Sequence, residues 1–204
     1  MENKLVLPKP EKVSTELATV HGDFEFIGYF WSERDDENLL VVAKRPFGDD
    51  PIVRVQSACY SGEIFESLDC DCHEQLVTSL ARIASEGGLL VYQLRDGRGA
   101  GLKTKLTALE MWRTLGVDTA DAYKSVGVPV DPRDYAKVSY VLHDLGVSAV
   151  RLLTNNPRKI TGLQTGGLIV SREPLEIAVD PTSEKGKYLK TKAEKLGHLI
   201  RQFK

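Results

Sequence analysis

The hydrophobic pattern of this chain changes its period once, near residue 73, and this change limits the folds open to it. Before that point, apolar residues form short strand-like runs at Phe24–Tyr29, Leu39–Val42 and Ile52–Ser57. After it, apolar residues recur at helical spacing, at Leu76, Leu80, Ile83 and Ala84. The N-terminal part is therefore expected to be rich in strands, and the first helix is expected to end at Gly87 and Gly88.

Strands and helices are expected to alternate along the rest of the chain. The expected elements are a strand over Leu89–Tyr92, a helix from about Leu102 to Leu115, a helix from Pro132 with Asp131 as its N-cap, a strand over Ala149–Thr154, a short helix, a strand near Leu168–Val170 and a basic helix over Tyr188–Lys204. A β-rich start followed by alternating elements predicts a mixed α/β or α+β fold.

Size and charge exclude several classes of protein. The 204 residues suffice for one substantial domain, and a net charge of −2 argues against binding nucleic acid by bulk electrostatics. No apolar run approaches the length of a membrane span, and the polar segment Met1–Glu11 lacks the apolar core of a signal peptide. We therefore expect a cytoplasmic protein that uses neither nucleic acid nor a membrane as its partner.

All three cysteines of the chain, Cys59, Cys70 and Cys72, lie within 14 residues. In a cytosolic chain of this size, an odd and clustered set favours a metal or catalytic role over a disulfide framework. Three thiolate ligands and one water are typical of a catalytic zinc site. The simpler interpretation is a set of buried apolar cysteines. His73 adjoins Cys72 at a helix start and is expected to face away from the metal.

A glycine-rich loop at residues 95–101 carries Arg95 and Arg98 and leads to Lys103 and Lys105. Glycines allow backbone amides to approach a phosphate closely, and a following helix N-terminus favours negative charge. The spacing fits neither a P-loop nor a dinucleotide fingerprint. Taken alone, the loop is as well explained by an ordinary surface turn. Beside a thiolate zinc site, a phosphate-binding loop is the better interpretation.

Two further polar segments follow predicted elements. Asp131 and Arg133 lie at a helix start, where a capping carboxylate and a surface arginine are the commoner finding. The segment from Thr154 to Lys159 leads from a strand into a helix and could bind an anion or only cap that helix. The lysines of the C-terminal segment are interpreted as a solvated helix face.

Taken together, these motifs resemble the GTP cyclohydrolase II family. The matching segments are Arg54–Cys59, Cys70–Leu76, Asp96–Leu102, Asp131–Tyr135, Arg151–Lys159 and Tyr188–Leu199. Their order and spacing hold from about residue 15 to the C-terminus. Residues 1–14 are accordingly predicted to be an N-terminal extension, and residues 15–204 a single domain of this family.

The resemblance implies a zinc-dependent hydrolase that opens the imidazole ring of GTP, releases formate and pyrophosphate and serves riboflavin synthesis. Cys59, Cys70 and Cys72 would hold Zn²⁺, Asp131 would be the proton acceptor and Arg133 the nucleophile. The implied nucleotide contacts are Arg54, Gln56, Ser57, Gln75, Asp96, Gly97, Arg98, Thr119, Thr154 and Lys159. The implied partners are Mg²⁺ bound with the triphosphate and a second copy of the chain in a homodimer.

Several residues depart from the family pattern. Gln56 replaces a histidine, Ala58 a glutamate, Asp96 a glutamate, His73 a glycine and Leu109 a tyrosine. The changes beside the metal are expected to alter base recognition, so another purine or a pyrimidine nucleotide is an alternative substrate. Loss of the tyrosine suggests a reaction that stops at a formylated intermediate. A third alternative is an inactive nucleotide-binding homologue.

Overall fold

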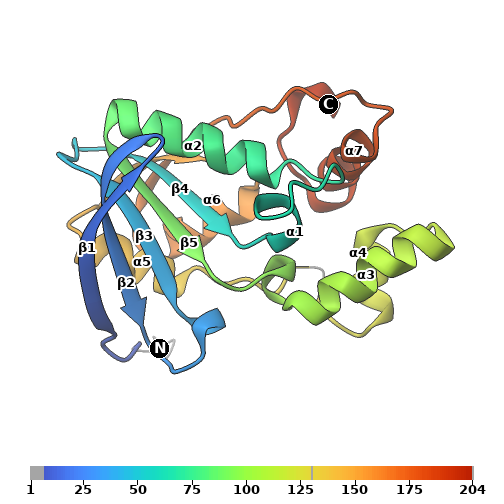
Figure 1. The fold of residues 1–204 in the computed structure, drawn as a ribbon, viewed down its shortest axis with the longest axis horizontal. Helices are drawn as coiled ribbons and strands as arrows, with labels where there is room; N and C mark the ends of the chain where they lie inside the picture. Colours follow the sequence, from blue (N-terminus) through green and yellow to red (C-terminus); the bar gives the residue numbers. More distant parts are fainter. Residues whose placement is uncertain (1–6, 130, 204) are drawn as a thin grey trace.

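The computed structural model describes residues 7–129 and 131–203, which form one seven-stranded sheet with helices on both faces (Figure 1). The strands are β1 (Glu11–Thr19), β2 (Gly22–Phe30), β3 (Leu39–Lys44), β4 (Ile52–Ser57), β5 (Gly88–Gln93), β6 (Ala149–Leu153) and β7 (Ile169–Glu173). The α-helices are α1 (Tyr60–Glu63), α2 (Cys72–Glu86), α3 (Leu102–Leu115), α4 (Thr119–Ser125), α5 (Ala136–Asp144), α6 (Pro157–Thr165) and α7 (Glu184–Leu196). The predicted mixed α/β fold is confirmed.

The sheet is half antiparallel and half parallel. Its strand order is β1-β2-β3-β5-β4-β6-β7. The β1, β2, β3 and β5 strands pair antiparallel in succession, whereas β5, β4, β6 and β7 run parallel. The parallel strands are joined by helical crossovers, as parallel pairing requires. Their carboxyl ends therefore meet at one edge of the sheet.

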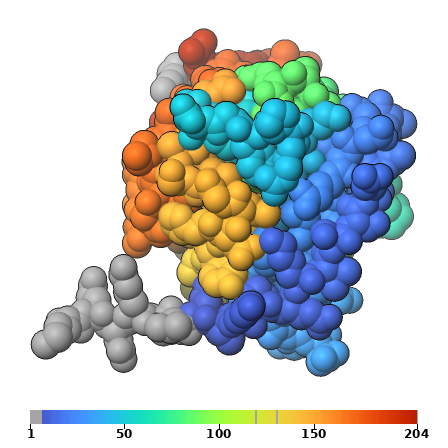
Figure 2. Space-filling model, turned by 90° about the vertical axis from the view of Figure 1, so that its left-hand side faces the viewer, coloured from blue at the N-terminus to red at the C-terminus, as the bar shows by residue number. Residues whose placement is uncertain are grey.

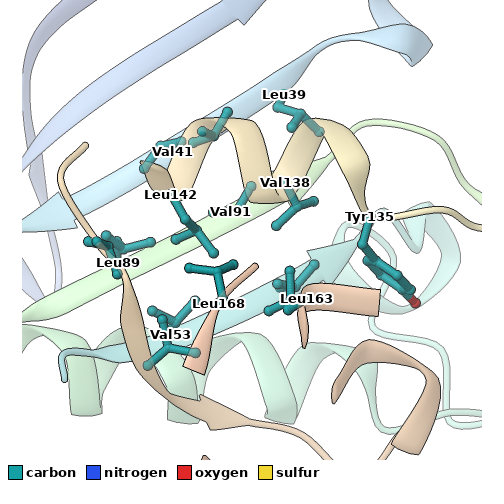
Figure 3. Close-up of a cluster of buried hydrophobic side chains, with 14 of the residues drawn as sticks. Leu39, Val41, Val53, Leu89, Val91, Tyr135, Val138, Leu142, Leu163 and Leu168 are labelled. Carbon is teal, nitrogen blue, oxygen red and sulfur yellow. The ribbon is translucent and has the colours of Figure 1, made fainter. Parts of the chain in front are cut away.

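Two apolar layers enclose the sheet. On one face, Val53, Val55 and Val91 pack against Val138 and Leu142 of α5 and against α6, as Figure 3 shows in part. On the other face, Ile52 and Leu90 pack against Ile83 of α2. This division follows from strand geometry, because successive residues of β4 point to opposite faces.

The α3 and α4 helices form an arm that projects from the body of the sheet (Figure 1). Their own small cluster of Ala108, Ala122 and Tyr123 is separate from the two layers on the sheet. Figure 2 views the molecule from the left-hand side of Figure 1, away from this arm, where α5 (gold) lies beside the N-terminal strands (blue). There the Asp144 carboxylate binds Lys12 Nζ at 2.8 Å and Tyr29 Oη at 2.7 Å. Within the described residues, every helix is too short or too polar to cross a membrane.

The structure corrects two expectations about the elements. The helix expected from Pro132 begins at Ala136, because the Asp131 carboxylate binds Arg133 and it is Asp134 that accepts from the Ala136 amide. The C-terminal helix spans Glu184–Leu196 rather than Tyr188–Lys204. Its first turn is capped by Ser183, and Gly197 ends it in the left-handed region with φ 65°.

The edge strand β1 was not expected from the sequence. It crosses the boundary proposed between residues 14 and 15. Residues 1–6 of the predicted extension lie outside the described residues, and the division into an extension and a single domain stays a prediction. Most of its side chains are exposed, and the strand therefore lacks the apolar alternation by which strands are recognised. Its pairing with β2, from Glu11 opposite Phe30 to Thr19 opposite Gly22, gives it its structure.

Candidate active site

The carboxyl ends of three neighbouring parallel strands bring the predicted motifs together. β4 leads to Cys59, β5 leads to the loop at Asp96, and β6 leads to Thr154. Segments far apart in sequence thus become neighbours at one edge, where open α/β sheets commonly bind ligands. The arm of α3 and α4 and the C-terminal segment with α7 complete the walls.

One cavity at this edge contains most of the predicted site. The predicted residues that line it are Arg54, Gln56, Ser57, Cys59, Cys70, Cys72, Gln75, Asp96, Gly97, Arg98, Arg133, Thr154 and Lys159. Asp131 lies just behind this wall, where it is bound to Arg133. Thr119 is the first residue of α4, and its side chain lies outside the described part of the structure.

The three cysteines converge as the metal hypothesis requires. The Sγ atoms of Cys59, Cys70 and Cys72 all lie within 4.8 Å of one another, and Cys59 and Cys70 are 3.8 Å apart. Sulfur ligands about 2.3 Å from a tetrahedral zinc ion stand about 3.8 Å from each other. The trio therefore fits such an ion. His73 is not part of this group among the described residues, and its orientation away from the metal stays a prediction.

A lysine compensates the charge of the sulfur cluster. Lys105 Nζ lies 3.1 Å from Cys59 Sγ and 3.0 Å from Asp96 Oδ1. Hydrogen bonds from Cys70 and Cys72, together with the Lys105 ammonium, hold the pKa of Cys59 far below its usual value. The bond to Cys59 and burial raise the pKa of Cys70 to about 11. A site with three thiolates needs nearby cations if it is to acidify a water, and Lys105 is one.

Because Gly62 has no side chain, it leaves room for the sulfur atoms of the cysteines. A Cβ atom at this position would lie 2.7 Å from Cys70 Sγ and 3.2 Å from Cys59 Sγ. We expect Gly62→Ala to displace the sulfurs and to lower the zinc content of the purified protein at least about threefold. Metal analysis measures this. Gly48→Ala is the matched control, because a Cβ there would meet nothing within 4 Å. Unchanged zinc content in Gly62→Ala would contradict the proposed cluster geometry.

A half-buried carboxylate lies beside the cysteines. Gln56 and Tyr92 are partners in the parallel pairing of β4 with β5, so both reach Glu63 of α1. Glu63 accepts from Gln56 Nε2 at 2.6 Å, from the Tyr92 hydroxyl and from the Cys59 amide at 3.3 Å. Burial raises its pKa, although these three bonds oppose the effect. Glu63 thus ties the first cysteine to the strand floor.

Arg54 lies at the centre of the polar floor. It is 4% exposed, and it donates to Gln56 Oε1 at 2.6 and 2.8 Å, to Gln75 Oε1 at 2.5 Å and to the Leu153 carbonyl at 2.9 Å. Gln75 in turn donates to Asp71, which binds Lys192 Nζ at 3.0 Å. Burial lowers the pKa of Arg54 to about 10, so it remains a cation at neutral pH.

Asp131 and Arg133 form a buried bidentate pair rather than a helix cap. Arg133 Nε lies 2.7 Å from Asp131 Oδ1, and Nη2 lies 2.6 Å from Oδ2. Burial alone would raise the pKa of Asp131, but Arg133 outweighs it and the net shift is downward. Burial likewise opposes the charge of Arg133, and Asp131 reverses that effect and raises its pKa. Both groups are therefore ionised at neutral pH.

Two other predicted contacts are built into the frame of the cavity. Lys159, 5% exposed, donates to the Val55 carbonyl at 2.6 Å, and burial beside Arg54 lowers its pKa well below the usual value. Asp96 accepts from the Tyr60 amide at 2.9 Å and from the Gly97 amide. Asp96 therefore shapes the start of the glycine loop.

Several residues that line or support the site were not predicted. They are Glu63, Asp71, Trp112, Tyr123, Tyr188, Lys192 and His198. Lys192 was assigned to a solvated face, but its side chain is 12% exposed and paired with Asp71. The imidazole of His198 is half-buried among basic side chains, and this burial lowers its pKa to about 2. Glu63 could have been predicted from the sequence, because it follows Cys59 by only four residues. No local pattern indicated that residues of α7 reach the site.

Comparison with known proteins gives a consistent picture. A family model described as GTP cyclohydrolase II matches residues 10–174. The riboflavin biosynthesis protein RibBA of Bacillus mycoides (strain KBAB4) is 45% identical over 193 residues, covering 93% of this chain and 48% of that protein. RibBA of Chlorobium phaeovibrioides (strain DSM 265 / 1930) is 43% identical over 192 residues, covering 92% and 46%. The chain thus spans about half the length of these curated relatives.

A solved structure is also similar in part. It is RibBX, a two-domain 3,4-dihydroxy-2-butanone 4-phosphate synthase from A. baumannii. The TM-score is 0.41 and the sequence identity 19%, over 81% of this chain and 41% of that one.

Proposed function

This chain belongs to the GTP cyclohydrolase II family, and from that premise we propose that it is a zinc-dependent hydrolase that opens the imidazole ring of GTP. The proposed products are the ring-opened nucleotide, formate and pyrophosphate, and the proposed pathway is riboflavin synthesis. We further propose that it acts in the cytoplasm as a homodimer, with Mg²⁺ bound to the triphosphate. The fold and the family support the coarse reaction class.

One observation carries the proposal: a single cavity holds both the cysteine trio and a set of cations suited to phosphates. The cations that line it are Arg54, Arg98, Lys105, Arg133 and Lys192, and the basic side chain of Lys159, whose pKa burial lowers, also lines it. A triphosphate carries several negative charges, and arginines bind phosphate oxygens in bidentate geometry. A nucleotide can therefore place its base near the cysteines while its phosphates meet these cations.

The proposed metal chemistry rests on the cysteine trio. Cys59, Cys70 and Cys72 would hold Zn²⁺, which when bound supplies an acidified water for hydrolysis at C8 of the purine. Lys105 offsets the negative charge of the thiolates through its contact with Cys59. Glu63 accepts from the Cys59 amide and so holds the first ligand in place.

We propose that Asp131 accepts a proton and that Arg133 stabilises negative charge on the phosphate. Asp131 is ionised, so it can accept a proton. The resemblance implies that Arg133 is a nucleophile, but its raised pKa favours a guanidinium that stabilises charge at the α-phosphate. Arg133 also donates to Ser57 Oγ at 3.3 Å, which orients it toward the cavity.

A second candidate is a reaction that stops at a formylated intermediate. Leu109 lines the cavity beside Ala108 and Trp112, where the family has a tyrosine. This stretch of wall is therefore apolar and offers no side-chain hydroxyl at position 109. A nucleotide with a different base is also a candidate. The side-chain carbonyl of Gln56 accepts from Arg54 and its amide donates to Glu63, so Gln56 is compatible with a base other than that of GTP.

Product analysis distinguishes these candidates. The zinc-loaded protein is incubated with GTP, and the products are identified by mass spectrometry together with formate and pyrophosphate assays. Equimolar formate and pyrophosphate are expected from the leading proposal. A product that retains the formyl carbon supports early arrest, and Leu109→Tyr is then expected to restore formate release. Turnover of another nucleotide but not GTP would reject GTP as the substrate. Protein free of zinc that binds GTP without turnover would support the inactive homologue.

A further inference from the structure

The C-terminal helix α7 closes the cavity, although it lies beyond residue 174, where the family match ends. Three of its lysines attach it to two other parts of the molecule. Lys185 pairs with Glu74 of α2, and Lys192 with Asp71 just before that helix. Lys195 pairs with Asp118 and Asp121 at the start of α4. The helix thus connects the start of α2, next to Cys72, with the arm of α3 and α4. Figure 1 shows α7 near the loop that follows α1.

Arg98 adopts an unusual backbone conformation in the glycine loop. Its φ of 54° lies in the left-handed region, between Gly97 at 64° and Gly99 at 86°. A residue with a Cβ reaches this region at a cost, so other contacts must hold it there. Such outliers in a loop that lines a cavity are a reason to ask what the side chain is held for.

Two tyrosines from separate elements contact the Arg98 guanidinium. Its Cζ lies 5.4 Å from the ring centroid of Tyr123 in α4 and 6.0 Å from that of Tyr188 in α7. Both distances are within the range of cation–π attraction. Lys192 Nζ lies 4.4 Å from the same Tyr188 ring. The Tyr188 ring therefore connects a cation of α7 with the cation of the glycine loop.

We propose that Tyr188 is a positioning residue that holds the Arg98 guanidinium in the cavity for the phosphates of the nucleotide. The inference rests on the proposed function only for the identity of that nucleotide. What it states by itself is that a phosphate contact of this cavity depends on α7. Ring contact uses the face of a guanidinium, whereas phosphate oxygens bind its N–H groups, so the two kinds of contact do not compete. Tyr123 contacts Arg98 from the arm, and Tyr188 adds the second contact from α7.

A double-mutant cycle with inorganic triphosphate as the probe tests this role. Binding to the zinc-loaded full chain is measured by calorimetry for wild type, Tyr188→Leu, Arg98→Met and the double variant. Tyr188→Leu is expected to weaken triphosphate binding roughly three- to tenfold. In the Arg98→Met background, the same change is expected to have almost no further effect, because the pair has then already been broken.

Two further variants separate positioning from general structure. Tyr188→Phe keeps the ring and is expected to restore the binding that leucine loses. Lys190→Met is the matched surface control on α7, because the Lys190 side chain is 57% exposed and its pair with Glu194 is long at 3.8 Å. For GTP, the KM is expected to rise in Tyr188→Leu while kcat stays within about twofold. If the leucine variant does not fold, Tyr188→Met takes its place, with hydrogen exchange of residues 97–101 as a second measurement.

The outcomes distinguish the inference from the proposed function. Equal losses in both Arg98 backgrounds would overturn the inference, and so would a wild-type protein that does not bind triphosphate. Triphosphate binding that depends on both Tyr188 and Arg98 supports it, even if GTP is not hydrolysed. In that last case, the proposed function fails while the positioning role stands.

Discussion

Replacing Cys72 with serine is expected to remove the bound zinc and to reduce turnover at least about 1000-fold. Cys72 begins α2, and its sulfur lies within 4.8 Å of those of Cys59 and Cys70. A serine hydroxyl has nearly the same size but is a poor zinc ligand at neutral pH, so the remaining two thiolates cannot complete the site. Metal analysis should show zinc falling from about one per chain to near zero.

The control for this experiment lies on the same helix. Ser85→Ala changes an exposed hydroxyl that bonds only the Arg82 carbonyl near the other end of α2, and zinc and activity should not change. Circular dichroism and thermal melting establish that Cys72→Ser is folded. A folded Cys72→Ser protein with full activity would exclude the zinc-hydrolase proposal.

Arg133→Lys is expected to lower kcat about 100-fold and to raise KM much less. Lysine keeps the positive charge but cannot make the two parallel bonds with which Arg133 binds the Asp131 carboxylate at 2.7 and 2.6 Å. The complementary Asp131→Asn removes the proton acceptor and leaves a buried guanidinium without its counter-charge. That variant is expected to lose similar activity and about 3 kcal/mol of stability. Steady-state kinetics and chemical denaturation measure the two effects.

The chain contains a matched pair for comparison. Arg34 and Asp36 are also two residues apart and also form two bonds, at 3.3 and 3.2 Å, but both are exposed to solvent. Arg34→Lys should change neither kcat nor stability measurably, because surface pairs contribute little. If Arg133→Lys behaves like Arg34→Lys, the buried pair has no role in the reaction.

Local sequence determined the elements nearest the three cysteines. The segment Ile52–Ser57 was predicted with the same limits as β4, because its apolar residues Val53 and Val55 alternate with polar Arg54 and Gln56 as in a strand. The helical period from His73 and the glycine at Gly87, which ends α2 with φ 75°, were likewise predicted from the residues themselves. The clustered cysteines needed only a strand end and a tight turn to meet, so their convergence was predictable from spacing.

Tertiary structure decided the parts of the site that depend on distant contacts. The local sequence around Asp131 predicted a helix cap, but in the structure both carboxylate oxygens of Asp131 accept from the buried guanidinium of Arg133 instead. Lys192 had the pattern of a solvated face, yet α7 docks so that this lysine meets Asp71. The edge strand β1 is stabilised by its antiparallel backbone pairing with β2, which its own sequence does not indicate. Periodicity reports which face of an element is apolar, whereas the partner that a buried charge meets depends on packing between elements far apart in sequence.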